Sequence, residues 1–213
     1  MDNREIDIAV KNRIGPFIHY KGVFSSDQLP YIPINSKPIS FIANILSSKA
    51  DSNIVGHWVC FYYVCKPVKY LLFFDSYGLN PMFYSNDFTH YIKKNFSNVN
   101  IHYFDRQIQP DRSQKCGLYV IMFIHYISHF GLDKFISLYN QKFSIKKLYL
   151  NDILVMRYYF KYLSKIKTCQ YWRKIPGFRR AITFSECKQN IGKKSYFLYY
   201  IYYKFYILFS YKV

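Results

Sequence analysis

The run from Gly117 to Phe130 (GLYVIMFIHYISHF) constrains the fold most, because it is apolar nearly all round. A helix without a polar face is buried on every side, so this run predicts a helix at the centre of a folded domain. Gly131 follows at the position where helices commonly end with glycine. Cys116 stands at the predicted N-terminus, and the rest of the domain has to surround this helix.

Two short runs rich in aromatic and β-branched residues predict a pair of antiparallel strands. They are His57–Val64 and Tyr70–Asp75, separated by five residues that include Pro67. The pattern further predicts a helix over 86–96 and a third strand over 100–104.

The flanking segments carry weaker signals. Residues 12–33 are rich in turn formers and predict an irregular, extended entry segment. Residues 36–47 have apolar residues at the spacing of an amphipathic helix, and residues 150–164 predict a last amphipathic helix. The element order is therefore that of an α+β fold, with the buried helix packed on a small mixed β-sheet.

The chain has 213 residues, of which 51% are hydrophobic, so it can build a core of ordinary domain size. We expect one α+β domain over residues 1–165. Residues 166–213 form a basic, Tyr- and Phe-rich extension of unknown role.

The net charge of +18 is unevenly distributed. Residues 167–213 hold ten Lys and Arg residues against one acid, Glu186. A basic surface of this kind attracts nucleic-acid backbones or anionic lipid headgroups through salt-sensitive electrostatics, and a merely solvated basic face is the plainer alternative. The tail 195–213 is the one candidate for membrane contact, but Lys204 interrupts it, so an oligomer contact or a non-functional extension fits as well.

The compartment is indicated by cysteine use and by the N-terminal residues. Five cysteines are an odd number without the dense spacing of a disulfide scaffold, which favours a reducing environment. The polar start lacks the apolar segment of a secretory signal. We therefore expect an intracellular protein that is not secreted.

Cys116 is the candidate nucleophile, because the N-terminus of a helix favours a thiolate over a thiol. His57 is the candidate base, and Asp75 ends the neighbouring strand and could orient the imidazole. Gln109, seven residues before Cys116, offers a side-chain amide for an oxyanion. A buried structural thiol and an ordinary histidine are the alternatives that residue spacing alone leaves open.

Three segments together resemble the adenovirus endopeptidase (adenain-like) family of cysteine proteases, found in adenoviruses and in virus-like elements of the Polinton/Maverick type. They are Gly-His-Trp at 56–58, Leu-Phe-Phe-Asp-Ser-Tyr-Gly at 72–78, and the stretch from Gln109 to Cys116-Gly-Leu-Tyr at 116–119. Residues 15–17 and 29–30 look like the family's N-terminal segment, so the resemblance covers about residues 12–165. Ulp-type deconjugases are more distant relatives.

The resemblance implies a role for each motif residue. Cys116 is the nucleophile, His57 the general base, Asp75 the residue that orients it, and Gln109 an oxyanion donor. The resemblance also implies that Gly56 and Trp58 bind substrate in a narrow cleft, with a preference for small residues, typically Gly-Gly, beside the cut.

Two departures from the family pattern bear on partners. Adenovirus enzymes mostly carry Glu where Asp75 stands, a swap that preserves the role. Residues 87–115 contain no Cys, so the covalent peptide activator of the adenovirus enzyme is not expected here. DNA stays a candidate activator on charge, and protein precursors are the expected substrates, in the host nucleus or the virion.

The sequence thus predicts a cysteine endopeptidase of viral or virus-like structural precursors. The alternatives are a deconjugase of SUMO- or ubiquitin-like modifiers and a catalytically inactive module that binds nucleic acid or a membrane surface. No metal or cofactor is required for the chemistry. His125 and His129 have a metal-like spacing on one helix face, but no third ligand accompanies them and packing is the favoured interpretation.

Overall fold

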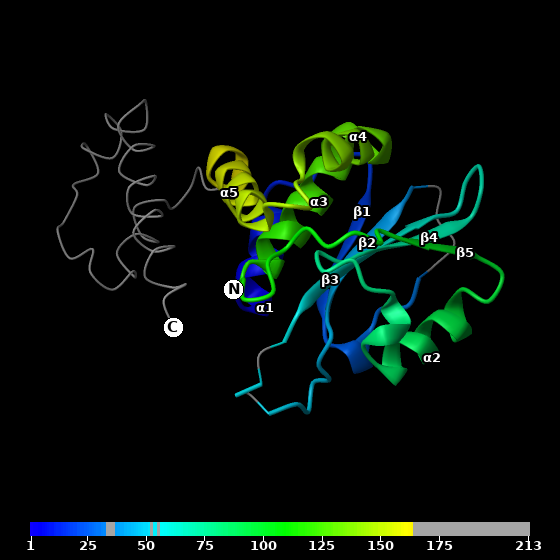
Figure 1. Ribbon diagram of the computed structural model, residues 1–213. Coiled ribbons are helices and arrows are strands. Elements are labelled where there is room, and N and C mark those ends of the chain that lie inside the picture. Colours follow the sequence, from blue (N-terminus) through cyan, green and yellow to red (C-terminus); the bar gives the residue numbers. More distant parts are fainter. Residues whose placement is uncertain (33–36, 52, 55, 164–213) are drawn as a thin grey trace, which may run out of the picture. The chain divides into compact units, whose positions relative to one another are not determined.

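The computed structural model describes residues 1–32, 37–51, 53, 54 and 56–163. Met1–Leu163 form one compact unit, and the basic extension predicted from residue 166 lies outside the described residues. Figure 1 shows a twisted sheet with helices on both of its faces. The α+β prediction, with a buried helix packed on a small mixed sheet, is confirmed.

The sheet has five strands in the order β1-β2-β3-β4-β5. The three central strands run antiparallel, and each edge strand is parallel to its neighbour. The strands are β1 (His19–Phe24), β2 (Ile39–Asn44), β3 (Trp58–Val64), β4 (Tyr70–Phe74) and β5 (Asn100–Tyr103). The predicted antiparallel pair and the predicted strand over 100–104 are thereby confirmed.

Both faces of the sheet are buried, which explains why its central strands are apolar almost without interruption. Along β3, Cys60 and Tyr62 contribute to the core that surrounds α3 (Cys116–Phe130). The alternate residues Val59 and Phe61 contribute to a second core against α2 (Asn86–Asn95). The period-two alternation of side chains therefore separates two apolar cores instead of a core and a solvated face.

The helical layer on the α3 side consists of α1, α3, α4 and α5 (Figure 1). Eleven of the fifteen residues of α3 are buried, as its sequence predicts. The helices around it are α1 (Asn3–Lys11), α4 (Leu132–Lys142) and α5 (Leu148–Tyr158), and a π-helical turn, η3 (Tyr159–Leu163), continues α5. Two short 3₁₀ helices, η1 (Ser26–Gln28) and η2 (Pro81–Phe83), complete the elements of the described residues.

The helix expected over 36–47 is wrong, because this segment forms β2. Phe41 and Ala43 face the α2 core while Ile42 faces the α3 core. Because both faces of β2 are buried, its apolar residues do not alternate with polar ones, and the resulting run resembles a helical pattern. The entry segment 12–33 likewise contains a regular strand, β1, besides irregular backbone.

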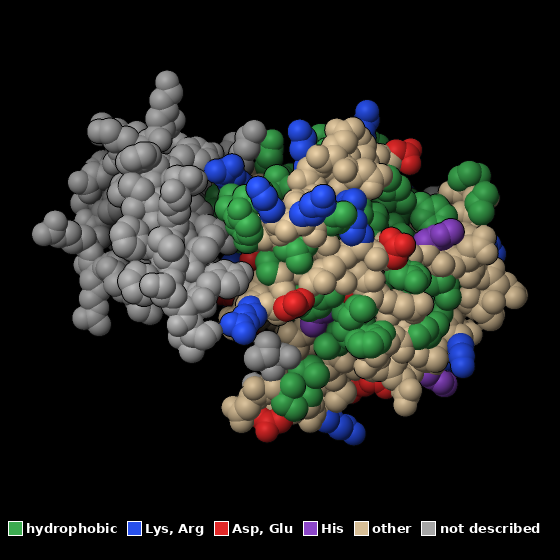
Figure 2. Space-filling model, viewed as in Figure 1, with side chains coloured by type: hydrophobic (Ala, Val, Ile, Leu, Met, Phe, Trp, Pro, Cys, Tyr) green, Lys and Arg blue, Asp and Glu red, His purple; other side chains and the backbone are tan. Residues whose placement is uncertain are grey.

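Charged side chains are unevenly placed on the surface. On the face shown in Figure 2, Lys and Arg side chains gather over the helical layer. Exposed lysines of the helical layer include Lys142, Lys146 and Lys147, at the end of α4 and before α5. In the described part of the chain, no helix combines the length and the apolarity that crossing a bilayer requires, and the tail 195–213 lies outside it.

Candidate active site

The register of β3 and β4 brings His57 and Asp75 to the same edge of the sheet. His57 directly precedes β3, Asp75 directly follows β4, and Cys60 is paired with Phe74 in the antiparallel ladder. The His57 Nε2 atom lies 2.6 Å from Asp75 Oδ1. Because a carboxylate only accepts hydrogen bonds, Nε2 carries the proton, and Nδ1 is left for another partner.

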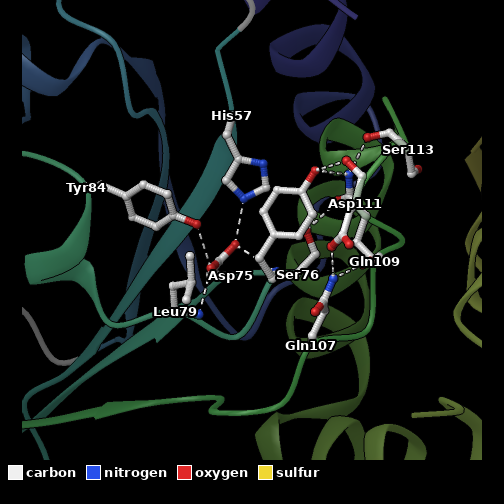
Figure 3. A network of polar contacts seen from close by, with 10 residues as sticks. His57, Asp75, Ser76, Leu79, Tyr84, Gln107, Gln109, Asp111 and Ser113 are labelled. Carbon is white, nitrogen blue, oxygen red and sulfur yellow. Dashed lines mark hydrogen bonds and ion pairs between the residues drawn. The ribbon is translucent and has the colours of Figure 1, made fainter. Parts of the chain in front are cut away.

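The Asp75 carboxylate is fully buried and accepts a hydrogen bond from four donors. Oδ1 accepts from His57 and from the Tyr77 N–H at 3.0 Å. Oδ2 accepts from the Leu79 N–H at 2.9 Å and from the Tyr84 hydroxyl at 2.8 Å. Figure 3 shows the Tyr84 hydroxyl and the His57 ring directed at this carboxylate. These four hydrogen bonds give both oxygens of the buried carboxylate partners and fix its orientation.

Cys116 begins α3 and faces His57. Burial raises the pKa of its thiol, but the hydrogen bond and charge of His57 and the backbone N–H groups of Trp58 and Gly117 outweigh this and lower it. The orphan N–H groups at the start of a helix act in the same direction. The side chain of Lys115, the residue before the helix, has no acceptor and makes no capping hydrogen bond, so it does not compete for these donors.

The surroundings of His57 raise its pKa from the ordinary 6.5 to about 9. Burial by itself would lower the pKa of the imidazole, but the hydrogen bonds to Asp75 and Cys116 and the negative charges of both raise it. The two shifts together favour a thiolate beside an imidazolium at neutral pH.

Gln109 lies on the loop between β5 and α3, which is fixed against the strand end that carries Asp75. The Ser76 carbonyl accepts hydrogen bonds from the N–H groups of Ile108 and Gln109, both at 2.9 Å. On the opposite side of the loop, the Ile108 carbonyl accepts from the Asn151 side chain at 2.8 Å and from the Tyr119 hydroxyl at 3.2 Å. The loop is thus held between the sheet edge and the helices α3 and α5.

The Gln109 amide is oriented by its own neighbours. Its Nε2 donates to the Ser113 carbonyl at 2.7 Å, and its Oε1 accepts from the Ser76 hydroxyl at 2.6 Å. Because a carbonyl oxygen only accepts, the amide nitrogen must face Ser113. The structure therefore brings Cys116, His57 and Asp75 together, with His57 hydrogen-bonded to both of the others. Gln109 joins this group through its hydrogen bond with Ser76, the residue that follows Asp75.

Two tyrosines that residue spacing does not single out complete the site. The Tyr77 ring stacks on the His57 ring with centroids 4.5 Å apart, and the Tyr84 ring stacks on it at 5.8 Å. The Tyr77 hydroxyl accepts from Gln109 Nε2 at 3.2 Å. The aromatic residue two positions after Asp75 was visible in the strand-end motif, whereas no sequence signal points to Tyr84.

Trp58 and Gly56, the residues assigned to substrate binding, flank His57. The Trp58 side chain is 6% exposed and belongs to the core around α3, while its backbone N–H binds the Cys116 sulfur. A Cβ atom at Gly56 would lie 2.3 Å from Asn44 Oδ1. Both residues therefore help to place His57 and Cys116.

A Gly56→Ala variant should be destabilised by about 1–3 kcal/mol, because its methyl group overlaps the Asn44 amide beside His57. Thermal or urea unfolding measures the loss. Adding Asn44→Ala removes the overlapping atoms and should recover part of the lost stability. A double variant no more stable than Gly56→Ala would show that the overlap is not the cause.

The histidine pair on α3 is occupied by protein partners. His125 Nδ1 lies 2.5 Å from the Tyr158 hydroxyl, and His129 Nε2 lies 2.8 Å from the Arg13 carbonyl. Within the described residues, no group of three or more His, Cys, Asp or Glu side chains could hold a metal ion. The packing role expected for His125 and His129 agrees with these contacts.

Comparisons with known proteins give distant similarities. No family model matches the chain, and no curated protein matches it. Two crystal structures of the ASFV pS273R protease are similar at 13% and 14% identity, with TM-scores of 0.40 and 0.43. The central domain of the uncharacterized Lpg1148 protein from Legionella pneumophila is similar at 14% identity, with a TM-score of 0.43.

The extent of these matches differs. They cover 59% and 76% of this chain for the two ASFV structures and 73% for the Legionella domain. They cover 43% and 66% of the ASFV chains and 96% of the Legionella chain. The chain thus spans less than two thirds of the ASFV protease chains. Its function is therefore inferred from the residues of the site itself.

Proposed function

We propose that this chain is a cysteine endopeptidase in which Cys116, His57 and Asp75 act as a triad. The observation that supports this proposal is the geometry of the three residues at one sheet edge. Asp75 binds His57 Nε2 at 2.6 Å, Nδ1 is left for Cys116, and the shifted pKa values favour the ion pair. A merely structural cysteine does not need a buried, hydrogen-bonded carboxylate behind its histidine.

The reaction is acyl transfer. The Cys116 thiolate attacks the scissile carbonyl, so that an S–C bond forms and the carbonyl π electrons move to oxygen. The His57 imidazolium gives its proton to the leaving amine as the C–N bond breaks. His57 then takes a proton from a water molecule as the water oxygen attacks the thioester, and the C–S bond breaks, which releases the acid and restores the Cys116 thiolate and the His57 imidazolium. Backbone N–H groups at the start of α3 stabilise the oxyanion.

For the substrate, we propose precursors of viral or virus-like structural proteins, cut at Gly-Gly-type sites, as the motif resemblance implies. Non-specific DNA is the proposed accessory partner, supported by the net charge of +18 and by exposed lysines such as Lys146 and Lys147. Viral structural precursors and DNA occur together in the host nucleus and in the virion, which are therefore the proposed compartments. Removal of ubiquitin-like modifiers is the competing use of the same chemistry.

The experiment offers the purified chain two probes. One is a peptide with Gly-Gly before the scissile bond and a fluorogenic leaving amine, and the other is a SUMO- or ubiquitin-like modifier with the same reporter at its C-terminus. Both are assayed with and without duplex DNA. Cleavage of the peptide that depends on Cys116 supports the endopeptidase, preference for the modifier favours deconjugation, and salt-sensitive DNA binding without any turnover would indicate an inactive binding module.

The pH dependence of Cys116 alkylation provides an independent prediction. We expect iodoacetamide to react with Cys116 at neutral pH, because His57 lowers the pKa of the thiol from its ordinary value of 9.0. As the pH rises through about 9, the His57 imidazolium loses its proton, and the ion pair is replaced by a thiolate beside a neutral imidazole. As the pH falls below the lowered pKa of Cys116, the thiolate is protonated.

Mass spectrometry of the Cys116 peptide measures this rate. In a His57→Ala variant the reaction should require a pH near or above 9, while an exposed-histidine control, His90→Ala, should behave as the wild type. An alkylation profile that is the same in wild type and His57→Ala would refute the ion pair.

A further inference from the structure

The Gln109 amide, expected to donate to the oxyanion, has no N–H left for a substrate. A primary amide nitrogen carries two hydrogens. One is directed to the Ser113 carbonyl at 2.7 Å and the other to the Tyr77 hydroxyl at 3.2 Å. Gln109 is also fully buried. The Gln109 amide therefore contacts the Tyr77 hydroxyl, and the Tyr77 ring in turn stacks on His57.

Tyr77 lies beside His57 and contacts its hydrogen-bond partner Asp75. Its ring lies against His57, which binds both Asp75 and Cys116, with centroids 4.5 Å apart and an interplanar angle of 26°. Its backbone N–H donates to Asp75 Oδ1 at 3.0 Å. Tyr77 thus contacts His57, Asp75 and Gln109 at once, and its side chain is half-buried rather than enclosed.

The backbone after Tyr77 is held by a close contact at Gly78. Gly78 has a φ of +73°, and a Cβ atom there would lie 2.6 Å from the backbone carbon of Arg106. This turn is pressed against the loop that carries Gln109, and only glycine fits the close approach. The position of the Tyr77 ring between His57 and Gln109 is therefore set by the fold.

The hydroxyl hydrogen of Tyr77 is available to a ligand. The oxygen accepts from Gln109, and the contact of the hydroxyl with the Asp111 carbonyl is long, at 3.5 Å. Burial raises the pKa of Tyr77, and the negative charges of Cys116 and Asp111 raise it further, so the phenol keeps its proton and stays a donor. Accepting a bond from an amide strengthens the donor side of a hydroxyl.

From this arrangement we infer that Tyr77 is a catalytic residue that donates its hydroxyl hydrogen bond to the oxyanion. Gln109 is then a positioning residue that holds and polarises the Tyr77 hydroxyl. The inference rests on the proposed function, since an oxyanion forms only when the Cys116 sulfur bonds to the substrate carbonyl. The Tyr77 proton stays on the phenol oxygen: it makes a hydrogen bond to the oxyanion, and this hydrogen bond is weakened when the carbonyl re-forms and the amine leaves.

The test compares Tyr77→Phe with Tyr103→Phe, an exposed tyrosine on β5. We expect Tyr77→Phe to lower kcat by about 10²-fold with KM changed by less than about 3-fold, as for removal of one oxyanion donor. Affinity for a peptide aldehyde, whose adduct with Cys116 carries an oxygen in the oxyanion position, should fall by a similar factor. The rate of iodoacetamide alkylation at pH 7 should stay within about 2-fold of the wild type, because alkylation forms no oxyanion.

A double variant separates the role of Tyr77 from that of Gln109. Gln109→Ala alone should lower kcat, but in the Tyr77→Phe background it should add less than about 3-fold, because Gln109 acts through the hydroxyl. Three results would each overturn the inference: unchanged kcat and aldehyde affinity in Tyr77→Phe, alkylation slowed in parallel with kcat, or a full additional loss from Gln109→Ala.

The aldehyde measurement also keeps this inference distinct from the proposed function. Adduct formation at Cys116 does not require turnover of any substrate. If the wild type hydrolyses neither probe, the proposed function fails, yet weaker aldehyde binding in Tyr77→Phe than in Tyr103→Phe still supports the donor. If the wild type is active and Tyr77→Phe equals it in both assays, the donor fails and the protease remains.

Discussion

Replacing Cys116 with Ala is expected to abolish peptide hydrolysis, and replacing His57 with Ala is expected to lower kcat by at least about 10⁴-fold. Without Cys116 no thioester can form. Without His57, burial raises the pKa of the thiol and no acid remains to protonate the leaving amine. Initial rates with the Gly-Gly peptide, extended to long incubation, measure both losses.

The effects of substitutions within such a catalytic unit are strongly non-additive. The double variant Cys116→Ala, His57→Ala should be no worse than Cys116→Ala alone, since the single change already removes the pathway. His90→Ala, an exposed histidine on α2, serves as the matched control and should retain the wild-type rate. Hydrolysis that persists in Cys116→Ala would assign the turnover to another group and contradict the mechanism.

The positions of Cys116, His57 and Asp75 could be predicted because each lies at the end of a regular element with a strong pattern. The apolar run predicts where the buried helix begins, and the two aromatic runs predict where the strands begin and end. The register between the strands could not be read, because β3 and β4 are buried on both faces and a shift of one residue would leave an equally apolar pattern. The pairing of Cys60 with Phe74 decides it.

Other elements were missed for different reasons. Asp2 and Glu5 form a capping box at the start of α1, but the helix behind this signature has only nine residues, so its apolar period is short. The segment of β2 was interpreted as a helix because strands buried on both faces lose their alternation. The short helix α4 was missed because it begins directly after Gly131, which ends α3. Its two buried residues, Phe135 and Tyr139, do have the helical spacing.

Apart from the bond between His57 and Asp75, the side-chain hydrogen bonds around the site could not be predicted, because they join distant segments through irregular backbone. Tyr84 reaches Asp75 from the end of η2, and Ser76 reaches Gln109 across 33 residues of sequence. Such contacts depend on turn geometry that no periodicity encodes. These same contacts determine how Asp75 responds to substitution.

Replacing Asp75 with Ala should lower kcat by about 10²–10⁴-fold, because the imidazole then loses both its orienting acceptor and its stabilising charge. The Leu79 N–H and the Tyr84 hydroxyl would also be left without their acceptor in a buried site, which should cost about 1–3 kcal/mol of stability each. Urea unfolding separates this stability loss from the loss of activity.

Asp75→Asn provides the sharper comparison, because it keeps one acceptor oxygen and removes the charge. Its kcat should lie between those of the wild type and Asp75→Ala. The His57 pKa should fall below about 9, since an imidazolium is less favoured without the carboxylate, so the titration of the imidazole followed by NMR should move to lower pH. Asp105→Asn, at an exposed position, is the matched control. An unchanged imidazole titration in Asp75→Asn would show that Asp75 orients His57 without contributing to the charge balance of the ion pair.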